Sequence, residues 1–93
     1  MKGYKGMNPD MTCRGFQYEV GKTYKAEGEI ELCSNGFHFC ENLRDTFDFY
    51  SFGESRYFEI EANGEIITSV NKCVAAEISI IQELTPIEVD RYY

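Results

Sequence analysis

The stretch SRYFEIEANGEII (residues 55–67) has the pattern of a β-hairpin and decides the fold class. Phe58, Ile60 and Ala62 alternate with acidic residues, as expected of a strand with one buried face. The pair Asn63-Gly64 tolerates the positive φ angles of a tight turn, and the chain then returns through residues 65–67. The sequence therefore predicts two antiparallel strands joined at residues 63–64.

Further strands are predicted on both sides of this hairpin, because apolar and polar residues alternate in short runs between turn signals. These runs are residues 2–6, 13–24 with a turn at Gly21-Lys22, 27–32, 36–40 and 73–84. Ser34-Asn35-Gly36 is the turn signal between the third run and the fourth. Pro86 ends the last strand, and we expect the tail after it to lie against the sheet or to fray.

Residues 42–51 are the best helix candidate. Leu43, Phe47 and Tyr50 follow helical spacing, and Asn42 precedes them as an N-cap. With one helix among several short strands, the predicted class is α+β: a small β-rich domain with an antiparallel sheet and one short helix at about 42–51. Residues 1–93 are expected to form a single domain, since the chain is too short for two.

The charge of the chain is uneven. Residues 1–25 carry five basic and two acidic side chains, a net charge of +3, and residues 26–93 carry four basic and fourteen acidic ones, a net charge of −10. The sum is the net charge of −7. Such a surface repels nucleic-acid phosphates and attracts basic protein surfaces, so we expect a protein partner and no direct nucleic-acid binding.

No apolar run has the length of a signal-peptide core or a membrane span. We therefore expect a cytoplasmic protein without membrane contact, in which thiols stay reduced. In that setting, four cysteines in a short chain favour metal binding over disulfides.

Three soft ligands lie within LCSNGFHFCEN (residues 32–42), namely Cys33, His38 and Cys40. Strand alternation places His38 and Cys40 on one face, about 7 Å apart between Cα atoms. Cys33 enters from before the turn. Cys13 is the expected fourth ligand, because it precedes the Arg14-Gly15 turn.

Cys13, Cys33, His38 and Cys40 would form a tetrahedral Cys3His site for a structural Zn²⁺ that staples the fold. Cys73 is the alternative fourth ligand, although its apolar strand favours a buried thiol. Other interpretations are simple burial of all these groups, a Cys33–Cys40 disulfide, and a Cys–His catalytic dyad.

Two pairs of carboxylates at i, i+2 spacing are the candidate partner-binding residues: Glu29, Glu31, Glu59 and Glu61. Each pair is either a solvated sheet face or part of an acidic stripe that meets a basic partner. Lys5-Gly6 and Arg14-Gly15 have the composition of anion-binding turns, and ordinary turns share it.

Three blocks, CRGFQYEVGKTY, GEIELC-x2-GFHFCEN and SRYFEIEANGEI, resemble a family of small domains encoded by phages and prophages. The resemblance covers roughly residues 3–67. The matching positions are Cys13, Gly15, Phe16, Cys33, Gly36, Phe37, His38, Cys40 and Glu41. All four proposed zinc ligands are among them, and Cys73 is not.

A stand-alone copy of this length is also similar to small acidic phage anti-CRISPR proteins, in particular type II-A Cas9 inhibitors. That resemblance implies a non-enzymatic phage protein in the bacterial cytoplasm that binds Cas9 or its guide-RNA complex and blocks target-DNA loading. The alternatives are a phage accessory protein without inhibitory role and a degenerate ADP-ribosyltransferase. The latter resemblance lies in the segments 4–6, 36–39 and 76–78, but the chain lacks that family's arginine and Ser-Thr-Ser strand.

Overall fold

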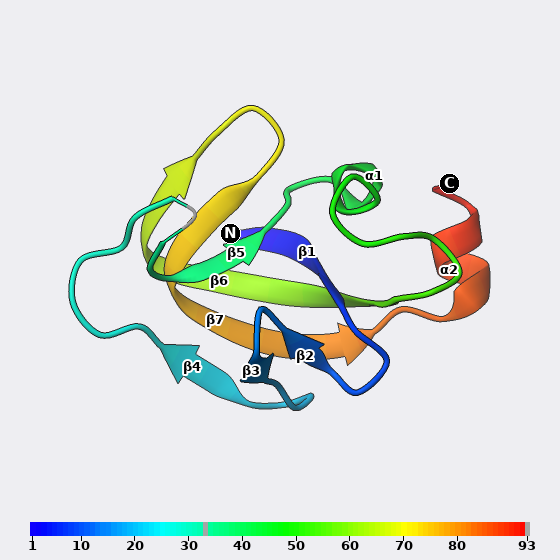
Figure 1. Ribbon diagram of the computed structural model, residues 1–93, viewed down its shortest axis with the longest axis horizontal. Coiled ribbons are helices and arrows are strands. Elements are labelled where there is room, and N and C mark those ends of the chain that lie inside the picture. Colours follow the sequence, from blue (N-terminus) through cyan, green and yellow to red (C-terminus); the bar gives the residue numbers. More distant parts are fainter. Residues whose placement is uncertain (33, 93) are drawn as a thin grey trace.

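A computed structural model describes residues 1–32 and 34–92 of the chain. Figure 1 shows two long central strands, surrounded by shorter strands and two short helices. In chain order the elements are β1 (Lys2–Met7), β2 (Thr12–Cys13), β3 (Phe16–Gln17), β4 (Thr23–Lys25), β5 (Phe37–Phe39), α1 (Leu43–Thr46), β6 (Arg56–Thr68), β7 (Cys73–Glu83) and α2 (Pro86–Asp90). All strand pairs are antiparallel, so the predicted β-rich, antiparallel class is confirmed.

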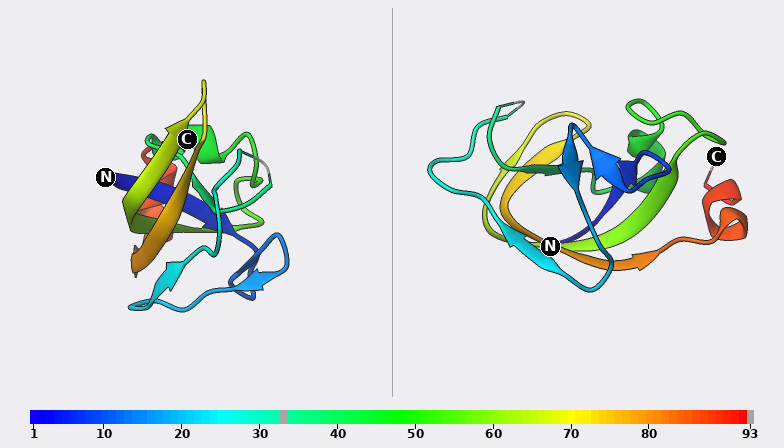
Figure 2. Two further views of the ribbon diagram at one scale, coloured as in Figure 1. Left: turned by 90° about the vertical axis from the view of Figure 1, so that its left-hand side faces the viewer. Right: turned by 60° about the horizontal axis from the view of Figure 1, so that its bottom comes forward.

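The main sheet is built on β6 and β7. β1 pairs with the outer side of β6, while β4 and β5 both pair with the other side of β7. β5 lies opposite residues 73–75 and β4 opposite residues 77–79, so the two short strands follow one another along a single edge. β2 and β3 form a separate small hairpin. The long strands curve strongly, which brings the two edges of the sheet toward each other (Figure 2).

The two edges meet where β1 passes the end of β5. Tyr4 donates its backbone N–H to the Cys40 carbonyl at 2.7 Å, and Cys40 returns the bond to Tyr4 at 2.8 Å. The order β1-β6-β7-β5 therefore closes back on β1 at this point, which we call the seam. Gly3 permits the close approach, because a Cβ atom there would lie 2.5 Å from Phe39 Cδ2 and 2.8 Å from the Cys40 oxygen.

The core lies inside this curve. The inward residues Phe58, Ile60 and Ala62 of β6, and Ile78 and Ile80 of β7, are at most 1% exposed. Burial of the Phe and Ile side chains contributes about 1.5–3 kcal/mol each and is the main stabilising term. A smaller cluster, made of Leu43, Tyr57, Leu84 and Val89, fixes the two helices to one end of the sheet.

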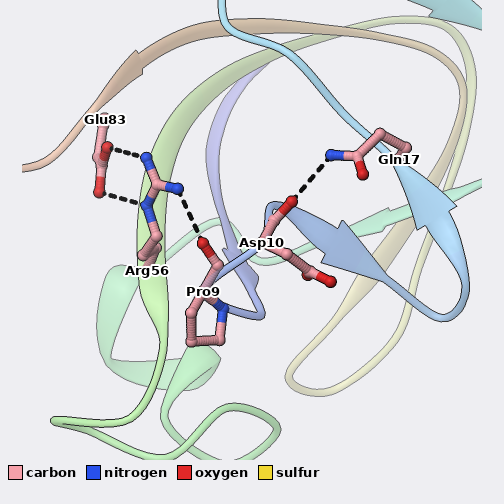
Figure 3. Close-up of polar contacts among 5 residues, drawn as sticks. All are labelled: Pro9, Asp10, Gln17, Arg56 and Glu83. Atoms are coloured by element: carbon pink, nitrogen blue, oxygen red, sulfur yellow. Dashed lines mark hydrogen bonds and ion pairs between the residues drawn. The ribbon is translucent and has the colours of Figure 1, made fainter.

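An arginine clamp fixes the loop between β1 and β2. Arg56 donates two hydrogen bonds to Glu83, at 2.9 and 2.6 Å, and a third to the Pro9 carbonyl at 3.0 Å (Figure 3). On the far side of this loop, Gln17 of β3 donates to the Asp10 carbonyl at 2.9 Å. The clamp thus connects β6 and β7 to the loop that carries the β2–β3 hairpin.

The predicted hairpin turn at Asn63-Gly64 is wrong. β6 runs through both residues, and the pairing with β7 shifts register between Asn63 and Ile66. Gly64 has φ +75, a backbone conformation that serves a β-bulge as well as a turn. The reversal comes later, where Ser69 donates its backbone N–H to the Lys72 carbonyl at 2.8 Å.

Three other predicted elements are shorter than expected or absent. The strand predicted in the run 13–24 before the Gly21-Lys22 turn is reduced to Phe16–Gln17, because β2 ends at Cys13 and the positive φ angles of Arg14 and Gly15 make a turn there. Residues 27–32 form no strand, and only the isolated bridge between Glu31 and Asn35 remains there. The helix spans Leu43–Thr46 instead of 42–51, and Asn42 makes no side-chain capping bond. The segment after α1 is held by a tertiary contact, because Tyr57 donates its hydroxyl proton to the Tyr50 carbonyl at 2.7 Å.

The tail is a helix rather than a frayed end. Thr85 and Glu88 form a capping box, and Pro86 occupies the first turn of α2. No helix in the described part of the chain is long and apolar enough to cross a membrane.

Candidate functional site at the seam

A pocket of about 310 Å³ opens beside the seam. Its walls come from β1, the β2–β3 turn, β5, the segment that follows α1, and the β6–β7 turn. Three cationic side chains line it, Lys5, Arg14 and Lys72, together with the chain's only histidine, His38. No Asp or Glu is among the described residues that line it, although the chain contains 16 acidic residues. The pocket is thus a cationic site in an acidic protein.

Lys5 forms the floor of the pocket and is only 4% exposed. Its ammonium group donates to the backbone carbonyl of His38 and lies 5.3 Å from the centre of the Tyr18 ring. Burial lowers the pKa of Lys5, while the neighbouring Cys13 raises it. The carbonyl and the ring face are the contacts that a buried ammonium needs, so Lys5 is held as part of the fold.

Arg14 and His38 meet at the mouth of the pocket. Arg14 and Gly15 both have positive φ, 54 and 80, in the tight turn between β2 and β3. The turn brings Arg14 Nη1 to 3.1 Å from His38 Nδ1 and 3.5 Å from Nε2. A guanidinium only donates hydrogen bonds, so the imidazole accepts this bond and is neutral. Burial, followed by the charges of Arg14, Lys5 and Lys72, lowers the pKa of His38 to about 4.

Lys72 approaches from the β6–β7 turn on the opposite side. Its ammonium group lies 5.7 Å from the centre of the Phe49 ring, which is 48% exposed. Next to it, Asn71 donates to Asp48 at 3.5 Å. These contacts join the β6–β7 turn to the segment after α1, so the outer wall of the pocket is made of two loops that touch.

Two buried thiols complete the lining. Cys13 accepts a hydrogen bond from the Tyr50 hydroxyl at 2.8 Å. Cys40 is 4% exposed, and burial raises its pKa to about 12, with Asp45 and Cys73 acting in the same direction. The Cys40 thiol is therefore protonated near neutral pH and is a poor nucleophile there.

Comparison with family models gives a match over residues 1–91 to a family described as a domain of unknown function, DUF7666. The chain belongs to the DUF7666 family. No match was found among curated proteins, and none among solved structures. The family description names no phage origin and no anti-CRISPR activity, so both stay predictions.

The predicted zinc ligands of this DUF7666 chain are brought together only in part. Cys13, His38 and Cys40 line the same pocket. Cys33 lies outside the described residues. Within residues 1–32 and 34–92, no three His, Cys, Asp or Glu side chains are placed to share a metal ion. Arg14 stands at the imidazole where a metal would bind, so the described side chains do not fit Zn²⁺ in this arrangement. The zinc site stays a prediction.

Cys73, the alternative ligand, is a buried strand residue. It begins β7, lies opposite Phe39 and is 3% exposed. Burial raises the pKa of its thiol, and the charge of Glu41 raises it further. It does not line the seam pocket.

The four predicted partner-binding carboxylates lie on two different elements. Glu59 and Glu61 are on β6, where Glu59 pairs with Lys2 at 3.5 Å and Glu61 with the Met1 ammonium group at 3.0 Å. Glu29 and Glu31 are exposed in the loop between β4 and β5, so their shared strand face is not formed. In that loop, Asn35 donates its side-chain amide to the carbonyls of Glu27 and Glu29, at 2.8 and 2.7 Å.

The sequence singled out two of the basic side chains of this pocket, although ordinary turns were the favoured interpretation of both. Lys5-Gly6 and Arg14-Gly15 were candidates for anion binding, and the structure places both side chains at the seam. Lys72 carries no local signal, because its position at the pocket depends on the β6–β7 turn. That turn was expected earlier in the chain, at Asn63-Gly64.

Proposed function

We propose that this DUF7666 domain binds a small anionic molecule in the seam pocket. The observation that carries the proposal is the lining: Arg14 and Lys72 line the pocket together with the buried Lys5, and no carboxylate is among the described lining residues. Like charges gathered in a partly buried site oppose one another, and a bound anion relieves that repulsion. Because the chain as a whole is acidic, a pocket lined by basic side chains is distinctive in this protein and favours an anionic ligand.

The shape of the pocket supports the same function. Its volume of about 310 Å³ is at the lower end of the range for small-molecule sites, which are concave, largely apolar and carry a few convergent polar groups. Tyr4, Phe39, Phe49 and Tyr50 supply the apolar part of the lining. The seam hydrogen bonds and the buried Lys5 hold one wall in place, so the site is pre-formed.

A titration with inorganic phosphate tests this function. We expect saturable amide shift changes at the seam in two-dimensional NMR spectra, which sodium chloride at equal ionic strength does not cause. Lys72→Gln should weaken binding, because it removes one cation of the lining. Lys22→Gln is the matched control, since Lys22 is exposed, pairs with Glu19 and lies away from the pocket. Absence of saturable shifts with phosphate and sulfate would refute the proposal.

As a second function, we propose the inhibition of a host defence protein, with Cas9 as the candidate target. The acidic loop between β4 and β5 favours it, because the loop is held in shape while its carboxylates face solvent. Ile30 of this loop is buried, and Asn35 donates to two of the loop's carbonyls. A basic protein surface is the complementary partner for such a loop.

A cleavage assay tests the inhibitor. Cas9 should cut its target DNA more slowly when the domain is present, and the double variant Glu29→Lys/Glu31→Lys should lose that effect. Lys72→Gln should keep it, because Lys72 belongs to the β6–β7 turn and not to the acidic loop. Unchanged cleavage across several Cas9 orthologues would rule the inhibitor out and leave the pocket proposal untouched.

A further inference from the structure

A second hollow adjoins the seam pocket. It measures about 210 Å³ and shares four lining residues with the pocket: Lys5, Cys13, Arg14 and His38. The pair of Arg14 and His38 therefore stands in the common wall of the two spaces. No carboxylate is found among the described residues of the second hollow either.

Arg14 is placed to exchange its bond to His38 for a bond to a ligand. It is exposed at the tip of a hairpin whose strands have two residues each, and the second hollow offers its side chain room to turn. Its bond to His38 is made to a neutral imidazole. A guanidinium bonds a phosphate or carboxylate more strongly, in bidentate geometry, because both partners are then charged.

Aromatic rings lie on the pocket side of this wall. Phe49 is 48% exposed at the rim, and Tyr4 and Tyr50 line the space between the rim and the seam. Rings of this kind bind flat apolar groups by stacking or by edge contacts, which are worth about 0.5–1.5 kcal/mol beyond the burial of area. An anion alone would leave these rings exposed to water.

We infer that the ligand is a planar aromatic molecule with one terminal phosphate or carboxylate, and that Arg14 is the residue that selects it. The anionic group replaces His38 as the partner of Arg14, and the ring enters the seam pocket beside Phe49. This inference rests on the proposed binding of a small anion and adds the aromatic part and the role of Arg14. The size of the pocket allows about one ring with its substituent.

Three probes separate the parts of this inference: phenyl phosphate, inorganic phosphate and phenol, each titrated by NMR or calorimetry at constant ionic strength. We expect phenyl phosphate to bind about tenfold more tightly than inorganic phosphate, because it adds the ring contacts. Phenol should bind more weakly than phenyl phosphate by at least the same factor, because it lacks the charged group.

Two variants give distinct signatures. Arg14→Gln should weaken phenyl phosphate and inorganic phosphate alike, about tenfold each. Phe49→Leu should weaken phenyl phosphate alone, to the affinity of inorganic phosphate. Lys22→Gln should change neither. Amide spectra of the free variants check that the fold is kept, and Phe49 is exposed enough for its replacement to be tolerated.

Each possible result tests one part of the inference. Equal binding of phenyl phosphate and inorganic phosphate, with both weakened by Arg14→Gln, would overturn the aromatic ligand and keep the anion site. Equal binding of phenol and phenyl phosphate would overturn the role of Arg14. Failure of all three probes would overturn the proposed function itself.

Discussion

Tyr4 and Cys40 exchange two backbone hydrogen bonds, and this pair joins the two edges of the main sheet. Both residues also line the seam pocket, so closure of the sheet and formation of the pocket depend on the same contact. The structure of the seam can therefore be tested through stability and through ligand binding.

Gly3→Ala should open the seam. The added Cβ atom would meet Phe39 and the backbone oxygen of Cys40, and backbone cannot move aside as a side chain does. We expect a loss of about 1–3 kcal/mol in the free energy of unfolding, measured in urea, together with faster hydrogen exchange at the Tyr4 amide. Lys2→Ala serves as control, because Lys2 is exposed. A Gly3→Ala protein as stable as the wild type would show that the seam is not tightly closed.

His38 should titrate far below an ordinary histidine. As the chain's only imidazole, it gives a single set of ring signals, and these should follow a pKa of about 4 instead of 6.5. Arg14→Gln should raise this pKa, because it removes a neighbouring positive charge. Since the folded pKa lies below the unfolded one, the unfolded chain binds more protons between pH 6.5 and 4, and stability should fall as pH is lowered through that window. A normal titration near pH 6.5 would contradict the contact between Arg14 and His38.

Arg56→Gln should release the clamp on the loop between β1 and β2. It removes the two bonds to Glu83 and the bond to Pro9, and we expect a loss of about 1 kcal/mol, because the pair is partly exposed. Arg56 lowers the pKa of Glu83, so this stabilisation is present above the unfolded pKa of glutamate and is lost as pH falls through the folded pKa. Urea unfolding at pH 7 and pH 3 measures both effects. An unchanged stability of Arg56→Gln at pH 7 would refute the clamp.

Zinc content decides between the metal prediction and the anion site. The predicted Cys3His site requires one zinc per chain after purification, and Cys40→Ala should lose the metal and much of the stability. Cys73→Ala, which changes another buried thiol, should keep the metal. A purified protein that folds without zinc would refute the metal site and leave the bond between Arg14 and His38 as the arrangement at the pocket.

The local alternation of apolar and polar residues correctly predicted three of the strands. Residues 2–6, 36–40 and 73–84 correspond to β1, β5 and β7 almost to the residue. The prediction of a turn at Asn63-Gly64 was wrong, because a β-bulge and a tight turn both use positive φ angles. Only the pairing of β6 with β7 distinguishes the bulge from the turn. The helix α2 was missed although Thr85, Pro86 and Glu88 form a recognisable capping signal.

The site was harder to predict than the strands. His38 and Cys40 could be placed on one strand by alternation, and Arg14 by its turn. Lys72 joins them through the β6–β7 turn, and the bond between Tyr4 and Cys40 depends on curvature accumulated over the whole sheet. Such contacts between residues distant in sequence leave no local signal.

The closed strand order also bears on how the chain is made. β1 leaves the ribosome first, but its partner β6 lies in the second half of the chain, and β5 reaches β1 only once β7 supports it. β1 therefore stays without its β6 partner until β6 has been made, and pairings so distant in sequence form slowly. If the seam pocket binds an anion as proposed, that binding should appear only when translation has passed β7, and chains truncated before β7 should not bind.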